Sequence, residues 1–158
     1  MFKFSVLTIS DRCSKGECED TSGKVIIDMM NNLDGEVACY EIVPDEPDLI
    51  KDKLITYCDH LKVQLVLTTG GTGLGPRDVT PEATREIAHK IIPGISEAIR
   101  LEGMKKTKKA MLSRGISALR RGSIIINLPG SPRGVRESLE IILDIIPHAL
   151  DMVKGMRH

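Results

Sequence analysis

The chain of 158 residues contains no tryptophan, and aromatic residues make up only 3% of it. Proteins that bind single-stranded nucleic acid stack its bases on aromatic side chains, so this scarcity argues against that class. Neither sign of charge is in excess, because 22 lysine and arginine residues balance 22 aspartate and glutamate residues. No apolar run in the sequence approaches the ~20 residues that a membrane-spanning helix needs. We therefore expect neither nucleic acid nor a membrane as a partner.

Cysteine is also scarce, and its spacing matches no metal-binding pattern. Cys13 and Cys18 form one close pair, but no second close pair completes a zinc site, and the histidines are scattered. We expect Cys39 and Cys58 to pack in the core and all the thiols to stay reduced, as is usual in the cytoplasm. The residues after Met1 run straight into a strand pattern, without the architecture of a secretory signal peptide, so we expect a cytoplasmic protein.

The hydrophobic pattern alternates between strands and helices along the chain. Apolar runs of strand length alternate with segments of helical period, and Pro147 is expected to kink or split the last helix. The predicted strands are 2–9, 37–43, 65–69 and 123–128, and the predicted helices are 23–33, 47–61, 81–91, 95–109 and 135–153. A further short, antiparallel strand fits within 111–121. This order predicts one domain, 1–158, of the α/β class: a three-layer αβα sandwich around a mostly parallel sheet.

A glycine-rich run follows the third predicted strand, which ends at Thr68 and Thr69. The glycines of this run are Gly70, Gly71, Gly73 and Gly75. Without a Cβ atom, glycine lets backbone N–H groups turn toward a ligand, and such a cradle suits phosphate. Thr80 and Pro81 then fit the start of a helix, whose N-terminus also favours phosphate. The glycines alone are equally compatible with a tight turn, and their spacing matches neither a Walker A loop nor a dinucleotide-binding fingerprint.

Two carboxylates lie next to this predicted cradle. Asp78 belongs to the glycine-rich loop, where a carboxylate would repel phosphate unless it holds Mg²⁺ on a nucleotide. Asp45 follows the second predicted strand, and either it caps the next helix or it contacts Mg²⁺ or a nucleotide. The loops after the parallel strands should meet, because the carboxyl ends of such strands share one edge of a sheet. These loops are 10–11, 44–45, 69–70 and 127–129.

Five segments of the sequence together indicate a family. The first is the string from Thr69 to Glu82, Thr-Gly-Gly-Thr-Gly-x-x-x-Arg-Asp-Val-Thr-Pro-Glu, which resembles the signature of the MogA/MoaB proteins of molybdenum cofactor biosynthesis and of the gephyrin G domain. The other matching segments are 7–23, 43–46, 110–114 and 126–132. They occur in the order of the family and cover nearly the whole chain. One departure is Lys108-Lys109, where family members often carry a proline and an apolar residue.

The resemblance implies a molybdopterin-binding-like fold and an adenylyltransferase activity, in which molybdopterin and ATP give adenylyl-molybdopterin and pyrophosphate. It implies Asp45 and Asp78 as catalytic residues and as the ligands of Mg²⁺. Nucleotide and phosphate would be bound by two turns rich in small residues: Gly70, Gly71, Thr72, Gly73 and Gly75, with Pro129, Gly130 and Ser131. Molybdopterin would be bound by polar side chains of two other segments: Ser10, Asp11, Ser14 and Asp20, with Ser113 and Arg114.

Several of these residues have a simpler interpretation. Asp20 is equally typical of a solvated loop acid, and Asp11 is less typical of one. Arg114 is equally typical of a surface ion pair, and 129–132 also fits an ordinary turn. The lysines of 105–109 either form a solvated helix end or attract an anionic substrate.

Two other functions stay open at this point. One is a MoaB-like protein that binds molybdopterin without catalysis or serves as a scaffold. The other is a CinA-like nucleotide hydrolase, although such proteins usually carry an additional domain. The resemblance also implies a homo-oligomer, a homotrimer or a hexamer, with a molybdenum insertase as a possible protein partner.

Overall fold

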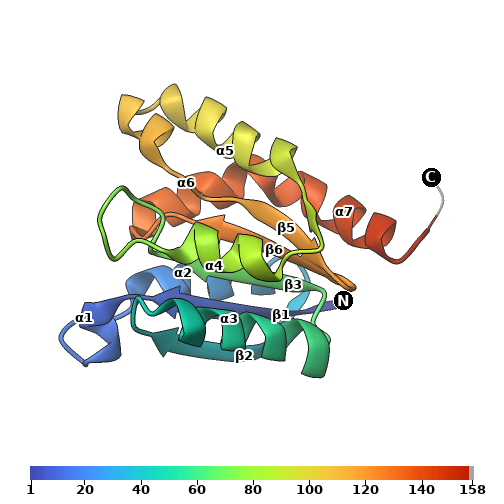
Figure 1. Cartoon of the computed structure of the whole chain (residues 1–158). Coiled ribbons are helices and arrows are strands. Elements are labelled where there is room, and N and C mark those ends of the chain that lie inside the picture. Colours follow the sequence, from blue (N-terminus) through green and yellow to red (C-terminus); the bar gives the residue numbers. More distant parts are fainter. Residues whose placement is uncertain (157–158) are drawn as a thin grey trace.

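The computed structural model describes residues 1–156, which form a six-stranded sheet with helices on both faces (Figure 1). The strands are β1 (Phe2–Ile9), β2 (Gly35–Val43), β3 (Leu65–Thr69), β4 (Lys90–Ile91), β5 (Ser117–Arg120) and β6 (Ser123–Leu128). Their order in the sheet is β2-β1-β3-β6-β5-β4. Strands β2, β1, β3 and β6 are parallel to one another, whereas β5 is antiparallel to β6 and β4 is antiparallel to β5. The predicted mostly parallel sheet and the additional antiparallel strand are therefore confirmed.

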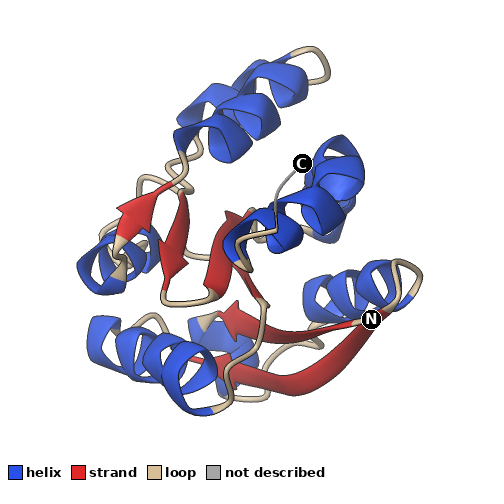
Figure 2. Ribbon diagram, turned by 90° about the vertical axis from the view of Figure 1, so that its right-hand side faces the viewer, coloured by secondary structure: helices blue, strands red, loops and turns tan. Residues whose placement is uncertain are grey.

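The helices form the two outer layers. The α-helices are α1 (Asp11–Ser14), α2 (Thr21–Asn31), α3 (Pro47–Ile55), α4 (Thr80–Ile87), α5 (Pro93–Met104), α6 (Pro132–Ile142) and α7 (Ile146–Val153). The shorter turns are the π-helix η1 (Thr56–His60) and the 3₁₀-helices η2 (Lys108–Leu112) and η3 (Leu143–Ile145). Helix α3 packs beside α4, and α2 packs beside α6, which in turn contacts α5 (Figure 2). None of the helices within residues 1–156 is long and apolar enough to cross a membrane.

The central strands β1, β3 and β6 are mostly apolar because the sheet is covered on both faces there. Strand β1 shows this alternation: Phe4 and Val6 belong to the core beneath α2 and α6, whereas Leu7 and Ile9 belong to the core beneath α3 and α4. All of these side chains are buried. A strand that is buried on both faces has no solvent-facing positions, so it has a continuous apolar sequence rather than an alternating one.

Helix boundaries differ from the predicted ones where pairing or proline intervenes. The predicted helix 81–91 is wrong at its end, because α4 stops at Ile87 and residues 90–91 pair with β5 as β4. The predicted helix 95–109 begins earlier, at Pro93, and ends at Met104. The predicted split at Pro147 is confirmed: η3 separates α6 from α7, and the proline occupies the first turn of α7, where its missing N–H is not needed.

Candidate functional site

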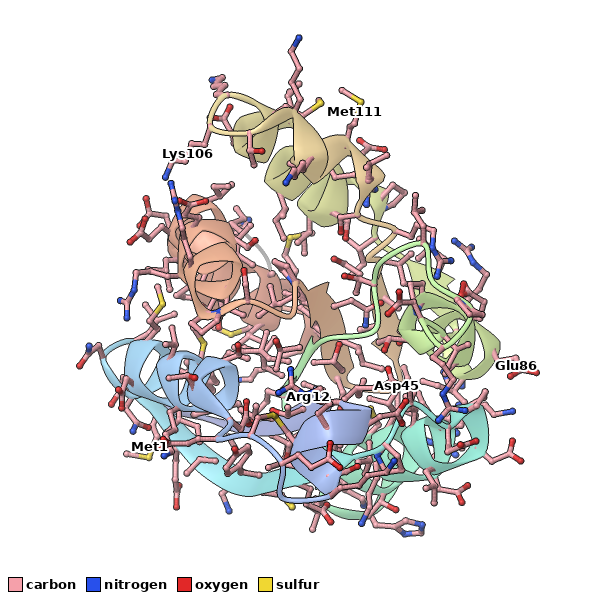
Figure 3. All side chains as sticks on the ribbon, turned by 90° about the vertical axis from the view of Figure 1, so that its left-hand side faces the viewer. Met1, Arg12, Asp45, Glu86, Lys106 and Met111 are labelled. Carbon is pink, nitrogen blue, oxygen red and sulfur yellow. A yellow bond between two sulfur atoms is a disulfide. The ribbon has the colours of Figure 1, made fainter. Side chains whose placement is uncertain are left out.

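The loops that follow β1, β2, β3 and β6 meet at one edge of the sheet, as the sequence predicts. The N–H of Asp11 donates to Asp45 Oδ2 over 3.0 Å, and the N–H of Asp45 donates back to Asp11 Oδ1 over 3.0 Å. Between the end of β3 and the loop after β6, the hydroxyl of Thr69 donates to the carbonyl of Pro129 over 2.6 Å. Figure 3 views the molecule from this edge, with Asp45 in the central part of the view. These bonds join the end of β1 to that of β2, and the end of β3 to that of β6.

The glycine-rich loop has a shape that only glycine adopts easily. Gly70 and Gly71 have φ angles of +98° and +70°, and a Cβ atom at Gly70 would clash with the carbonyl oxygen of Ile9. Thr80, predicted as a helix cap, instead donates its hydroxyl to the carbonyl of Gly70 over 3.0 Å. Within residues 1–156, the N–H groups of 71–73 donate to no protein acceptor. They are therefore available to an anion, as the predicted phosphate cradle requires.

Of the two predicted metal ligands, Asp78 belongs to this loop and Asp45 lies beside Gly71. Asp45 is half-buried, and Asp78 accepts the N–H of Gly75 through Oδ2 over 2.9 Å. Burial raises the pKa of Asp45, and the neighbouring carboxylates of Asp11 and Asp78 raise it further. The alternative that Asp45 caps α3 is wrong, since Glu46 is the N-cap residue and no side chain caps this helix. A cation bound here would reduce the repulsion between the negative charges around Asp45.

Asp45 and Asp78 fit a metal ion that arrives bound to a substrate better than a metal ion coordinated by protein side chains only. Across the described residues 1–156, no three side chains of His, Cys, Asp or Glu are grouped in a way that could hold a metal ion. Mg²⁺ usually takes only one or two protein carboxylates and completes its shell with water and substrate phosphates. Asp45 and Asp78 match that requirement.

Arg77 ties the glycine-rich loop to the ends of β1 and β2, a contact that the sequence did not suggest. Its guanidinium donates to both carboxylate oxygens of Asp11 over 3.0 and 2.9 Å, and to Glu46 over 2.9 Å. These hydrogen bonds from Arg77, with that from the N–H of Asp45, lower the pKa of Asp11 from 3.8 to about 2. Asp11, predicted to bind molybdopterin, is thus ionised and already paired.

We expect this pair to make stability depend on acid pH. Because the pKa of Asp11 is lower in the folded state, its contribution is complete above 3.8 and is lost as the pH falls toward about 2. Arg77→Gln should therefore lower the melting temperature at neutral pH, and its difference from the wild type should shrink in the acid range. Thermal melts of both proteins across pH measure this, with exposed Arg136→Gln as the control. A difference that stays constant as Asp11 titrates would contradict the assignment.

A cavity of about 450 Å³ opens beside the glycine-rich loop. Five predicted site residues line it: Thr72, Gly73, Ser113, Pro129 and Ser131. The other walls come from the facing sides of α5 and α6, with Arg100 and Ser96 on the first helix and Ile141 on the second. The cavity thus combines apolar surface with hydroxyl and backbone groups, as is typical of sites for small organic ligands.

The walls formed by α5 and α6 are parts of the site that the prediction missed, and α5 is the more informative one. Ser96, Ile99, Arg100 and Gly103 all line the cavity and are spaced at i, i+3, i+4 and i+7, so they share one face of the helix. A serine, an arginine and a glycine on the inward face of a helix depart from the usual apolar stripe. That departure is the signal in the sequence that could have identified this wall.

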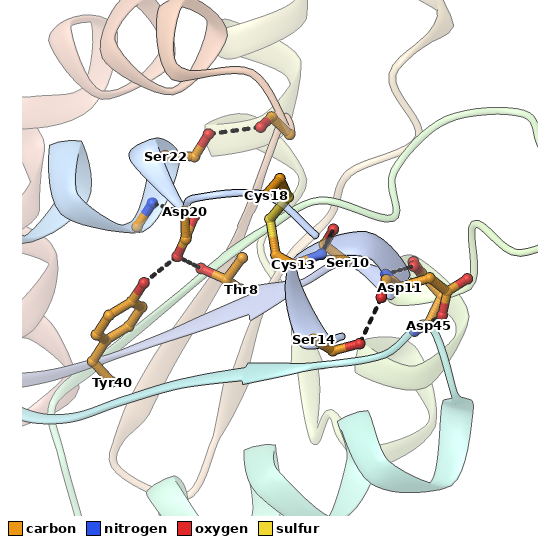
Figure 4. Close-up of a disulfide and its surroundings, with 12 residues drawn as sticks. Thr8, Ser10, Asp11, Cys13, Ser14, Cys18, Asp20, Ser22, Tyr40 and Asp45 are labelled. Carbon is orange, nitrogen blue, oxygen red and sulfur yellow. Dashed lines mark hydrogen bonds between the residues drawn. A yellow bond between two sulfur atoms is a disulfide. The ribbon is translucent and has the colours of Figure 1, made fainter. Parts of the chain in front are cut away.

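Asp20 lies in a closed network beneath the site. Its carboxylate accepts the hydroxyls of Thr8 and Tyr40 and the N–H of Gly23, and it is the N-cap residue of α2 (Figure 4). The side chain is buried, with 7% of the residue exposed. Nearby, the hydroxyl of Ser22 donates to the carbonyl of Gly130 over 2.7 Å and links the first loop to the last turn. In this arrangement Asp20 shapes the loop, and a contact with molybdopterin would require it to exchange partners.

Two predicted serines of the first loop also have local partners. Ser10 caps α1 by accepting the N–H of Cys13 over 3.1 Å, and exposed Ser14 donates to the carbonyl of Asp11 over 2.8 Å. Neither serine lines the cavity. Molybdopterin contacts by Ser10 and Ser14 stay predictions.

The prediction that all the cysteines are reduced thiols is wrong for one pair. Cys13 and Cys18 form a disulfide across the turn after α1, beside Asp11 and Asp20 (Figure 4). Cys39 and Cys58 are free, and burial raises the pKa of the Cys58 thiol to about 11. The spacing of the pair in the sequence does not show that the turn brings the two sulfur atoms together.

The lysine cluster divides between the two predicted roles. Lys105 pairs with Glu102 over 2.9 Å, and Lys106 lies 3.9 Å from Glu137, so both have an acidic neighbour on the surface. Lys109 lines the cavity. A single lysine of the cluster is thereby placed to meet an anionic ligand.

Comparison with known proteins identifies the family. The family model described as "Probable molybdopterin binding domain" matches residues 5–148. A molybdopterin adenylyltransferase of Helicobacter pylori (strain J99) is 46% identical over 152 residues, which are 95% of this chain and 86% of that protein. The crystal structure of the molybdopterin biosynthesis enzyme MoaB from Thermus thermophilus is 49% identical, with a TM-score of 0.94 over 99% of this chain and 98% of that one.

A third relative is the tungsten cofactor synthesizing protein MoaB from Pyrococcus furiosus. Its structure is 35% identical, with a TM-score of 0.86 over 97% of both chains. These matches extend over almost the whole chain and include the loops that form the site. The chain therefore belongs to the MogA/MoaB family, whose proteins share the molybdopterin-binding domain.

Proposed function

We propose that the protein is a molybdopterin adenylyltransferase, which transfers the adenylyl group of ATP to the terminal phosphate of molybdopterin and releases pyrophosphate. The observation that carries the proposal is the cavity beside the glycine-rich loop. It is lined by Thr72 and Gly73 of that loop and also by Ser113 and Ser131, so predicted binding residues from three segments face one space. Its volume of about 450 Å³ is in the range of sites for small organic molecules. The relative of Helicobacter pylori that carries this activity in its name supports the assignment.

The reaction joins two anions, so the site must hold them in line and offset their charge. Molybdopterin is proposed to lie in the cavity, with its phosphate against the free N–H groups of 71–73. There the terminal phosphate oxygen attacks the α-phosphorus of ATP, and pyrophosphate leaves with the electrons of the broken P–O bond. The chain contributes binding and orientation, and no protein nucleophile is required.

Mg²⁺ on the ATP phosphates is proposed to bind Asp45 and Asp78. When bound, the ion neutralises charge on the phosphates of the nucleotide. Asp45 fits this role because burial and two neighbouring carboxylates raise its pKa, so a cation nearby would stabilise its charged form. The reciprocal bonds with Asp11 hold its carboxylate at the edge of the sheet.

We propose further that residues 1–158 act as one domain in a homo-oligomer, a trimer or a hexamer, in the cytoplasm, where ATP is available. A molybdenum insertase would then receive the product. Light scattering on the purified protein distinguishes the trimer from the hexamer.

Turnover with molybdopterin and Mg-ATP tests the activity, with chromatography for adenylyl-molybdopterin and detection of pyrophosphate. Both products in equal amounts are expected. Tight binding of molybdopterin without turnover would instead indicate a binding or scaffold protein. Hydrolysis of the nucleotide without molybdopterin would indicate a CinA-like hydrolase, and no binding of either ligand would contradict all three functions.

A further inference from the structure

We infer that Arg114 is a positioning residue, which fixes the shape of the glycine-rich loop and the location of Asp78. It does not act as a ligand of a substrate phosphate. The part of this inference that concerns catalysis rests on the proposed function, whereas the part that concerns the loop does not.

The contacts of Arg114 with the loop are made entirely to backbone carbonyls. Its own N–H donates to the carbonyl of Thr72 over 2.9 Å, and its Nε donates to that of Gly73 over 2.8 Å. Its Nη2 reaches the far end of the loop and donates to the carbonyl of Asp78 over 2.8 Å. One residue thereby holds the beginning and the end of the loop.

The remaining nitrogen of the guanidinium is engaged as well. Nη1 donates to both carboxylate oxygens of Glu82, on the first turn of α4, over 2.9 and 2.7 Å. All three nitrogens of the side chain therefore have partners in the protein, and Arg114 does not line the cavity. Four of the five N–H groups of the guanidinium donate within the protein, so bidentate binding of a phosphate would break at least one of these bonds.

These bonds decide which way the loop faces. A trans peptide points its C=O and N–H to opposite sides, so the bonds of Arg114 to the carbonyls of Thr72 and Gly73 turn the N–H groups of 73 and 74 away from it. Thr80 holds the carbonyls of 70 and 71 and so orients the N–H groups of 71 and 72. A loop with so many glycines is costly to order, because glycine loses much conformational freedom on folding. Arg114 supplies that order in the absence of any ligand.

Arg114 is itself anchored to the wall of the cavity. Nη1 of Arg100, a cavity residue of α5, donates to the carbonyl of Gly115 over 2.8 Å and to that of Ser113 over 3.3 Å. The segment 113–115 is therefore held between α5 and the glycine-rich loop. This arrangement connects the cavity to Asp78 through a continuous set of hydrogen bonds.

Hydrogen exchange of the backbone amides tests the inference without any substrate. Arg114→Gln should speed the exchange of the hydrogen-bonded amides of the loop, those of Gly75, Asp78 and Thr80, at least ~10-fold, because several bonds to a charged group that hold the loop are lost. Glu82→Gln keeps the carbonyl bonds and should have a smaller effect. Arg85→Gln, at an exposed arginine on the same helix α4, is the matched control and should have none. Thermal melts establish that each variant is folded before its exchange is compared.

The second measurement is the dependence of turnover on Mg²⁺. Arg114→Gln should lower kcat and raise the Mg²⁺ concentration for half-maximal rate about 10-fold, since Asp78 is displaced, while KM for molybdopterin changes little. Arg114→Lys should recover little, because a single ammonium cannot span the two carbonyls and the carboxylate that the guanidinium bonds.

Two results would overturn the inference. One is normal loop exchange in a folded Arg114→Gln protein. The other is a rise confined to KM for a phosphate-containing substrate, which would make Arg114 a substrate ligand. If the wild type shows no turnover but exchange responds as expected, the proposed function fails and the positioning role stands.

Discussion

Asp78→Asn is expected to lower kcat for adenylyl-molybdopterin formation at least ~100-fold, and Asp45→Asn to do the same, because each removes a carboxylate that we assign to Mg²⁺. Asparagine preserves the shape of both side chains and can still accept the N–H of Gly75 or of Asp11. The loss should therefore come from the missing charge and not from a collapsed loop. Steady-state rates at several Mg²⁺ concentrations measure it, and excess Mg²⁺ should restore part of the activity.

A matched variant and a binding measurement separate this explanation from general damage. Asp52, an exposed carboxylate on α3 away from the site, provides the control, and Asp52→Asn should keep the rate of the wild type. Molybdopterin binding in the absence of nucleotide should be unchanged in all of these variants. Full turnover by the Asp78→Asn protein would show that this carboxylate is not needed for the metal and the nucleotide.

Gly70→Ala is expected to lower the free energy of unfolding by roughly 2 to 5 kcal/mol, from unfavourable backbone conformation and overpacking together. Gly70 has a φ of +98°, and its Cβ would meet the carbonyl oxygen of Ile9, which the parallel sheet holds in place. For a chain of this length such a change corresponds to a fall of roughly 10 °C in Tm. Calorimetry or thermal circular dichroism measures it.

Gly94→Ala is the appropriate control, because Gly94 lies in the first turn of α5 and a Cβ there would contact nothing. That variant should have the Tm of the wild type or a slightly higher one, since alanine favours a helix. If Gly70→Ala melts together with Gly94→Ala, the loop can adjust by moving away from β1, and the geometry assigned to the cradle is wrong.

Much of the site followed from the position of residues relative to strand ends. The apolar runs and the residues after them placed Asp11, Asp45, Gly70 and Pro129 at one edge, because parallel strands end together. The structure confirms that meeting by direct hydrogen bonds between the loops. No such rule shows where a long side chain ends, so the partners of Arg77 and Arg114 could not be predicted.

Tertiary contacts also decided which predicted binding residues already have hydrogen-bond partners within the protein. In the sequence, Asp20 and Arg114 are both charged residues of predicted loops. In the structure, Asp20 is buried and bonded to Tyr40, whereas Arg114 bonds to both ends of the glycine-rich loop. The disulfide between Cys13 and Cys18 has the same origin, since the turn after α1 sets the approach of their sulfur atoms. Each of these contacts depends on how a loop bends, which local residue preferences do not specify.

The sequence by itself determined the α/β class, the parallel strands and the family, because hydrophobic periodicity and glycine spacing are local properties of the chain. The tertiary structure alone decided the end of α4 at Ile87 and the contacts of the two arginines that fix the loop. Those features arise from pairs of residues far apart in the chain. Their hydrogen bonds and packing exist only once the sheet has brought the loops together.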